Sequence, residues 1–198
     1  EIVATGFNGN ARGYPHCDTI GCIKEKMGFK SGEGNDWCTA VHAEQNALLQ
    51  AGKQSRGSTL YLSICPCKIC SRMIINAGIK RVVIGMQDPN PLVNGKGIEK
   101  LKSEGIDVQC GILEENAKRI NETYIKYITE RVPFVVLKWA MSLDGKIATS
   151  TGDSRWISHP ASREFTHRLR GKFDAVLIGI ETLLKDNPHL TTHGVGIK

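Results

Sequence analysis

Two short motifs constrain this chain more than any other feature of its sequence. In "VHAEQNALLQ", His42 and Glu44 stand two positions apart at the start of a predicted apolar helix. In "PCKIC", Cys67 and Cys70 open another predicted helix. Two thiols at this spacing turn toward one point, and the exposed amides of a helix start favour the thiolate. With His42 they offer Zn²⁺ three ligands and leave a fourth position for water, as in catalytic zinc sites.

Each motif alone also has an ordinary structural explanation. A histidine near a helix start is often a cap or a packed side chain, and a Cys-x-x-Cys pair also occurs in structural zinc knuckles. Both motifs together, each opening a helix and joined by a predicted strand, favour catalysis. We therefore predict that Glu44 carries its carboxylate beside the water and moves protons to the substrate.

The composition is that of an ordinary globular protein. The chain has 198 residues, of which 40% are apolar and 23% charged. No apolar run approaches the roughly 20 residues of a membrane span. The net charge of +6 suits an anionic partner, but the charges are dispersed and only 6% of the residues are aromatic. This pattern favours a small-molecule substrate over a nucleic acid, and no membrane partner is expected.

Seven cysteines, without a signal-peptide layout at the first residues, favour metal binding or catalysis over a disulfide framework. A cytoplasmic location is the matching expectation. Cys110 lies in a strand-like context, and we expect it to be a small buried hydrophobic residue.

Strands alternate with helices along the chain, which predicts an α/β fold. The expected strands cover residues 1–5, 58–64, 80–86, 106–112, 132–142 and 174–180. The expected helices cover residues 42–51, 68–78, 98–105, 113–131 and 160–170. Gly52 is expected to cap the first of these helices.

The predicted helix 113–131 marks the end of a first domain. Its apolar side carries Leu113, Ala117, Ile120, Tyr124 and Ile128. A proline follows this charged helix near the start of a new predicted strand. We therefore divide the chain into domains 1–130 and 131–198.

The stretches "ATGFNGNARGYPHCDTIGC", "VHAEQNALLQAG" and "TLYLSICPCKICSRMIINAGIKRVV" contain the H-x-E…P-C-x-x-C signature of zinc deaminases. Residues 1–84 thus resemble the deoxycytidylate deaminases of the cytidine-deaminase superfamily. The resemblance implies a three-layer α/β/α domain and an assembly of identical chains. It implies His42, Cys67 and Cys70 as ligands of one catalytic Zn²⁺, with Glu44 as the proton shuttle.

The same resemblance implies that Asn8 and Arg12 lie close to a pyrimidine nucleotide. Asn8 stands in a Gly-flanked turn, so a structural role is equally consistent with the sequence. In that family, additional histidines and cysteines can hold a second, structural Zn²⁺. The candidates here are His16, Cys17, Cys22, Cys38 and Cys65.

Later stretches resemble a second family. "GIKRVVIGMQDPNPLVNGKGIEKLKSEGIDVQC", "PFVVLKWAMSLDGKIATSTGDSRWIS" and "IGIETLLKDNPHLT" are similar to the bifunctional riboflavin-biosynthesis deaminase–reductases, over residues 80–193. Those enzymes deaminate a phosphoribosylated diaminopyrimidine and then reduce its ribose with NADPH. The resemblance implies that the second domain begins a dihydrofolate-reductase-like, doubly wound fold.

Carried over by position, this resemblance assigns two groups of residues. The NADP group consists of Ala140, Trp156, Ser158, Thr182 and Asp186. The substrate group consists of Ser154, Arg170 and Leu190, of which Arg170 suits a phosphate by its charge and fork geometry. Trp156 and Leu190 are also consistent with a core, and Asp186 with a turn.

The chain departs from the second family in three ways. It has the short "PCKIC" and the "HAEQN" of the deoxycytidylate type, and His193 stands where the riboflavin enzymes tend to have an arginine. The resemblances also imply a helix and a strand before residue 1 and further reductase elements after residue 198. Reductase activity of these residues alone is therefore not expected.

The interpretation favoured by the sequence is a zinc-dependent deaminase of an aminopyrimidine nucleotide, acting in riboflavin biosynthesis. The first alternative is a deoxycytidylate deaminase, because the residues nearest the metal are of that type. A further alternative is a zinc module without catalytic activity.

Overall fold

The computed structural model describes residues 1–198 apart from 30–32, 92 and 195–198. Its internal contacts divide the chain into two compact units, residues 1–135 and 136–198. All strands found in the described residues belong to the first unit. None of the described helices is both long and apolar enough to cross a membrane.

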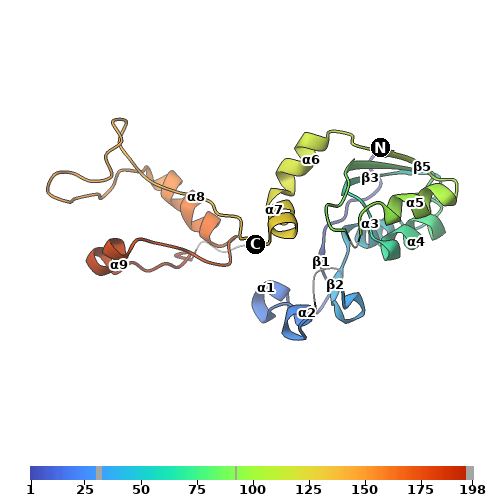
Figure 1. Ribbon diagram of the computed structural model, residues 1–198, viewed down its shortest axis with the longest axis horizontal. Helices are drawn as coiled ribbons and strands as arrows, with labels where there is room; N and C mark the ends of the chain where they lie inside the picture. The colour runs from blue at the N-terminus through green and yellow to red at the C-terminus, as the bar shows by residue number, and fades with distance from the viewer. Residues whose placement is uncertain (30–32, 92, 195–198) are drawn as a thin grey trace. The chain divides into compact units, whose positions relative to one another are not determined.

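A parallel sheet of three strands organises the first unit (Figure 1). Its strands are β3 (Thr59–Ile64), β4 (Arg81–Met86) and β5 (Asp107–Cys110), in the order β3-β4-β5. Helices α4 (Lys68–Asn76) and α5 (Lys96–Ser103) make the two crossovers, as parallel neighbours require. Because parallel strands end at the same edge, the segments that follow β3 and β4 meet there.

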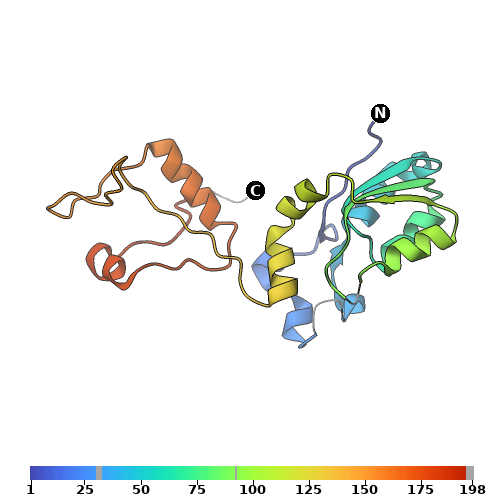
Figure 2. The ribbon, with the colours of Figure 1, turned by 45° about the horizontal axis from the view of Figure 1, so that its top comes forward.

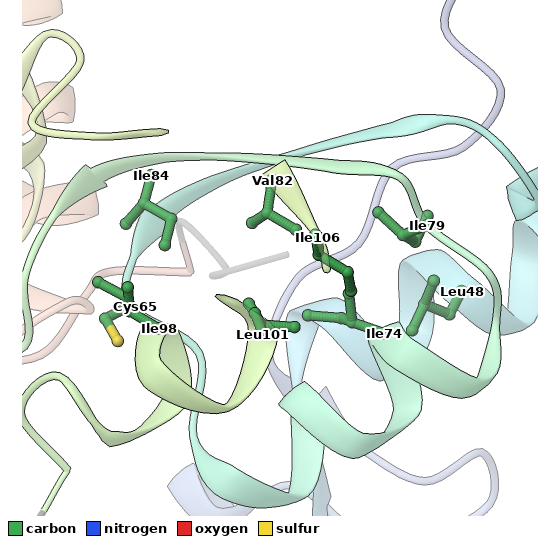
Figure 3. Close-up of a cluster of buried hydrophobic side chains, with 9 residues drawn as sticks. All are labelled: Leu48, Cys65, Ile74, Ile79, Val82, Ile84, Ile98, Leu101 and Ile106. Atoms are coloured by element: carbon green, nitrogen blue, oxygen red, sulfur yellow. The ribbon is translucent and has the colours of Figure 1, made fainter. Parts of the chain in front are cut away.

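The hydrophobic core lies between this sheet and the helices α3 (Ala43–Ala51), α4 and α5. Figure 3 shows strand side chains such as Val82 and Ile84 facing Ile74 of α4 and Leu101 of α5. These four side chains are fully buried. Burial of each contributes about 1.5–3 kcal/mol relative to an exposed position. Gly52 caps α3 as predicted, with φ +52° and its N–H donated to the carbonyl of Leu48.

Smaller elements surround the sheet. A two-residue ladder joins β1 (Gly9–Asn10) to β2 (Ala40–Val41), and between them lie α1 (Cys17–Ile20), α2 (Ile23–Lys26) and a 3₁₀ turn, Asn35–Trp37. A second 3₁₀ turn, Gly52–Ser55, follows α3. Helices α6 (Glu114–Ile120) and α7 (Glu122–Glu130) lie beside the sheet, away from α4 and α5 (Figure 2).

The predicted helix 113–131 is broken at Asn121 into α6 and α7. The Asn121 side chain donates to the carbonyl of Ala117 at 2.8 Å, which competes with the helical backbone pattern. Of the predicted apolar side, Ala117 and Ile128 are buried, whereas Leu113 and Ile120 are exposed. The prediction of one continuous apolar side was therefore wrong.

The prediction that Cys110 is buried was also wrong. Cys110 is exposed, because it ends β5, which is an edge strand with only four residues. The strand expected at residues 1–5 is not formed either, since the described pairing of this segment is confined to Gly9–Asn10.

The second unit contains the helices α8 (Pro160–Arg170) and α9 (Ile180–Asp186). The strands predicted at 132–142 and 174–180 are not formed. A strand exists only when a neighbour satisfies its backbone groups, and no described segment pairs with either stretch. Their apolar side chains stay exposed, as Leu137 and Leu177 illustrate with 76% and 96% of their surface accessible. None of the described residues of this unit is buried.

Candidate metal centre

His42 is held at the start of α3 by its neighbours. It is the N-cap residue, and its backbone N–H donates to Oε1 of Gln45 at 2.9 Å. The Gln45 amide also reaches Sδ of Met73 on α4 at 3.4 Å. Leu48 anchors α3 in the core, and the Gln45–Met73 contact holds the start of the helix, with His42, against α4.

Cys67 and Cys70 come from the segment that follows β3. Cys67 is the N-cap of α4, and its Sγ accepts a hydrogen bond from the backbone N–H of Cys70 at 3.5 Å. Cys70 lies one turn further and is fully buried. The helix start therefore turns both sulfurs toward the same point, as the sequence predicts.

The three side chains converge on one position. The Nδ1 atom of His42 lies 3.6 Å from Sγ of Cys67 and 3.3 Å from Sγ of Cys70. All three donor atoms lie within 4.8 Å of one another. In a tetrahedral zinc site, bonds of about 2.0–2.1 Å to nitrogen and 2.3 Å to sulfur separate the two donors by about 3.5 Å. The spacing and the soft donor set both fit Zn²⁺.

The protonation of the sulfurs supports metal binding. Hydrogen bonding from Cys70 lowers the pKa of Cys67 to about 4, so Cys67 is a thiolate at neutral pH. The same interaction raises the pKa of the Cys70 thiol, with burial adding to the rise. The two sulfurs thus share one proton, which a divalent cation would replace. Hydrogen bonding to Cys67 also raises the pKa of His42.

Glu44 lies in the first turn of α3 and interacts with His42, Cys67 and Cys70. Its burial raises the pKa of its carboxyl group, and the nearby His42 charge partly offsets that rise. Glu44 and Asn8 both line an open cavity of about 1010 Å³ over α3 and β3. A carboxyl group with a raised pKa beside a cavity is suited to accept and return a proton.

The two residues predicted to lie near the nucleotide, Asn8 and Arg12, have different surroundings in the structure. Oδ1 of Asn8 accepts from the backbone N–H of Ala43 at 2.8 Å and so satisfies a free amide of α3. Arg12 is exposed in the turn after β1. The structure therefore places Asn8 at the start of α3, and the role of Arg12 stays a prediction.

Comparison with known proteins supports the two resemblances. Residues 1–86 match the cytidine and deoxycytidylate deaminase zinc-binding region, and residues 133–198 match the RibD C-terminal domain. The riboflavin biosynthesis protein RibD of Aquifex aeolicus is 46% identical over 192 residues, which are 93% of this chain and 54% of that protein. The chain is a relative of the RibD proteins. It spans about half the length of the curated RibD relatives that it matches.

Solved RibD structures give the same result. A diaminohydroxyphosphoribosylaminopyrimidine deaminase/5-amino-6-(5-phosphoribosylamino)uracil reductase of Thermotoga maritima is 45% identical, with a TM-score of 0.71 over 78% of this chain and 46% of that one. RibD of Acinetobacter baumannii is 40% identical, with a TM-score of 0.67 over 76% of this chain and 44% of that one. The fold is thus α/β, a cytidine-deaminase-like domain followed by a RibD C-terminal, reductase-like segment.

Some of the NADP and substrate residues that the RibD resemblance implies line a common cavity, and others do not. Ser154, Trp156, Arg170 and Asp186 line a second cavity, of about 570 Å³, within residues 136–198. His193, the departure from RibD, lines it too, with its ring centroid 4.5 Å from that of His167. The remaining predicted residues do not line it: Ala140, Ser158, Thr182 and Leu190. These NADP and substrate assignments stay predictions.

The candidates for a second metal are not brought together. Among the described residues, the single group of three or more donors is that of His42, Cys67 and Cys70. Cys65 belongs to the hydrophobic core instead, and burial raises the pKa of its thiol.

Three polar residues that the sequence does not single out form a connected group after β4. Asp88 and Asn90 are buried in the loop after β4, and Tyr124 of α7 donates to Oδ1 of Asp88 at 2.8 Å. Asp88 is the one buried acidic side chain among the described residues. The signal in the sequence is an aspartate two residues after a buried strand, in "QDPNP".

Gly97 at the start of α5 packs on the cysteine segment, and replacing it with alanine tests that packing. A Cβ atom there would lie 1.9 Å from the carbonyl oxygen of Pro66 and 2.9 Å from Oγ of Ser71. We expect Gly97→Ala to lower the free energy of unfolding by about 1–3 kcal/mol, measured by urea unfolding. Glu99→Ala, on the exposed side of the same helix, is the control and should stay within about 0.5 kcal/mol. Equal stabilities would contradict the close contact.

Proposed function

We propose that this chain carries the deaminase of riboflavin biosynthesis, which hydrolyses an amino group of diaminohydroxyphosphoribosylaminopyrimidine with the help of Zn²⁺. The observation that carries the proposal is the convergence of His42, Cys67 and Cys70 beside Glu44 in a relative of RibD. The spacing of these donors fits one zinc ion, and we assign them as its ligands. Glu44 is the proposed catalytic residue.

Bound at these three donors, Zn²⁺ would lower the pKa of a water molecule toward neutrality. The carboxylate of Glu44 accepts a proton from the attacking water and delivers it to the ring nitrogen. Glu44 then takes the proton of the hydroxyl now on the ring carbon and gives it to the amine, so that the C–N bond breaks, ammonia leaves and the ring carbon becomes a carbonyl. The raised pKa of Glu44 suits both directions of this transfer.

We choose the riboflavin-pathway substrate because the resemblance to RibD covers more of the chain than the resemblance to deoxycytidylate deaminases. The residues nearest the metal are of the deoxycytidylate type, so deamination of deoxycytidine monophosphate is the second candidate. The RibD relatives, however, match 93% of the chain, including the segment after the deaminase domain. Homologous segments of this extent favour the riboflavin substrate.

The remaining assignments are also proposals. Asn8 and Arg12 are proposed near the nucleotide, and Asn8 shares the Glu44 cavity. NADPH is the proposed cofactor of the reductase-like segment, which matches the RibD C-terminal domain. The domain limits 1–130 and 131–198, a homo-oligomer and a cytoplasmic location stay predictions.

Ammonia release by the purified chain, with its zinc content measured, tests the proposal on two substrates in parallel. Turnover of the phosphoribosylated diaminopyrimidine is the expected result. Turnover of deoxycytidine monophosphate alone would contradict the riboflavin assignment and support the second candidate. One zinc per chain without either activity would support a module that only binds the metal.

A further inference from the structure

We infer that Tyr124 is a positioning residue of the metal centre: its hydroxyl anchors the loop after β4, and that loop holds the Pro66–Cys67 segment in place. This inference rests on the proposed function, because it concerns the same centre. It assigns a role to α7, a helix that supplies none of the proposed ligands.

The anchor is a hydrogen bond to a buried carboxylate. The Tyr124 hydroxyl donates to Oδ1 of Asp88 at 2.8 Å, and the backbone N–H of Asn90 donates to the same oxygen at 2.9 Å. Asp88 is 8% exposed. A buried carboxylate needs such donors, and removal of one costs more than the bond itself contributes. The loop conformation therefore depends on a group from α7.

Residues at both ends of the same loop contact Cys65 and Pro66, which directly precede Cys67. Before the loop, the carbonyl of Met86 accepts from the backbone N–H of Cys65 at 3.0 Å. After it, Gly97 lies against the Pro66 carbonyl, so closely that no side chain fits between them. A shift of the loop is thus transmitted to the residues on either side of Pro66.

Ser71 completes the connection to the proposed ligands. Its hydroxyl lies 2.9 Å from the carbonyl oxygen of Cys67 and 3.4 Å from the carbonyl oxygen of Gly97, so it bridges α4 and α5. Ser71 is fully buried and directly follows Cys70. The path from Tyr124 to the sulfurs consists of Asp88, Asn90, Asn94, Gly97 and Ser71. The Asn94 N–H donates to the Asn90 carbonyl at 2.9 Å and so continues the path from Asp88 to α5.

The hydroxyl of Tyr124 remains a donor over the whole neutral range. Burial, followed by the hydrogen bond to Asp88, raises its pKa above the ordinary value near 10. The tyrosine therefore stays protonated wherever the deaminase is assayed, and a change seen in Tyr124→Phe is not a titration effect.

The test removes the Tyr124 hydroxyl and measures the Co²⁺ affinity of the metal centre. We expect Tyr124→Phe to bind Co²⁺ about 10–100-fold more weakly in chelator competition, the loss typical of groups that orient metal ligands. The thiolate–Co²⁺ absorption bands should change as well. Tyr127→Phe removes the hydroxyl of an exposed tyrosine on the same helix and is the matched control. Circular dichroism confirms that each variant is folded at the assay temperature.

A double-mutant cycle tests the path. If Tyr124 acts through Asp88, the double variant Tyr124→Phe/Asp88→Asn should bind Co²⁺ no more weakly than Asp88→Asn alone. Co²⁺ affinity and absorption bands of Tyr124→Phe equal to those of the parent chain would overturn the inference, even if its melting temperature fell. Because this readout needs no turnover, it decides the inference even where both deamination assays fail and the proposed function is rejected.

Discussion

The Glu44→Gln variant is expected to keep one zinc per chain and to lose about 10²–10⁴-fold of its deamination rate, the range typical of a lost general acid–base. Glutamine keeps the size and the hydrogen-bonding capacity of the side chain but cannot take up and return a proton. Glu44 is next to the three donor atoms without being one of them, so metal binding should survive. The measurement is ammonia release together with zinc content by elemental analysis.

Glu99→Gln is the matched control for this variant. Glu99 is exposed on α5 and does not belong to the donor group, so the same change of charge there should leave both zinc content and turnover as they are. Full activity of Glu44→Gln would remove Glu44 from the mechanism. Loss of zinc from that variant would instead show that the carboxylate helps to hold the metal.

Replacement of Cys67 is expected to abolish both metal binding and activity. With two donors left, the centre no longer meets the three-ligand minimum of a catalytic zinc site. Cys67→Ala also removes the N-cap of α4, which costs about 1 kcal/mol by itself. Cys67→Ser retains an oxygen that can cap the helix, so this second variant separates the loss of a ligand from the loss of a cap. Zinc content, turnover and urea unfolding are measured for both.

Cys110→Ala is the control, because Cys110 is an exposed cysteine at the end of β5. It should keep the zinc content and turnover of the parent chain. A Cys67→Ser protein with one zinc per chain would refute the assignment of Cys67 as a ligand. The comparison of the two Cys67 variants then shows how much of the lost stability belongs to the cap.

The convergence of the three donors was predictable because local rules fix each part of it. A Cys-x-x-Cys at a helix start places both sulfurs near the first turn, and His42 begins a helix whose Leu48 joins the same core. The sequence does not fix how α3 meets α4. The contact between Gln45 and Met73 belongs to that packing, and no pattern in the sequence predicts it.

The errors lie where structure depends on partners that are distant in the sequence. The stretch around Leu137 has the composition of a strand, but a strand needs a paired neighbour, which the described residues do not supply. Helix periodicity likewise could not show that the side chain of Asn121 would interrupt the backbone pattern. The contact between Tyr124 and Asp88 spans 36 residues, so each looked ordinary in its own segment.

The separation of the donors along the chain has a consequence for how this fold responds to metal. Cys67 and Cys70 are neighbours on one helix, whereas His42 precedes Cys70 by 28 residues. An ion held by all three closes a loop of that length, much as a disulfide would. A covalent cross-link over such a loop removes chain entropy worth roughly 3–4 kcal/mol from the unfolded state. The ion would thus join α3 to α4 by a reversible cross-link, and a chelator would reopen the loop without any oxidation or reduction of the cysteines, which are all free.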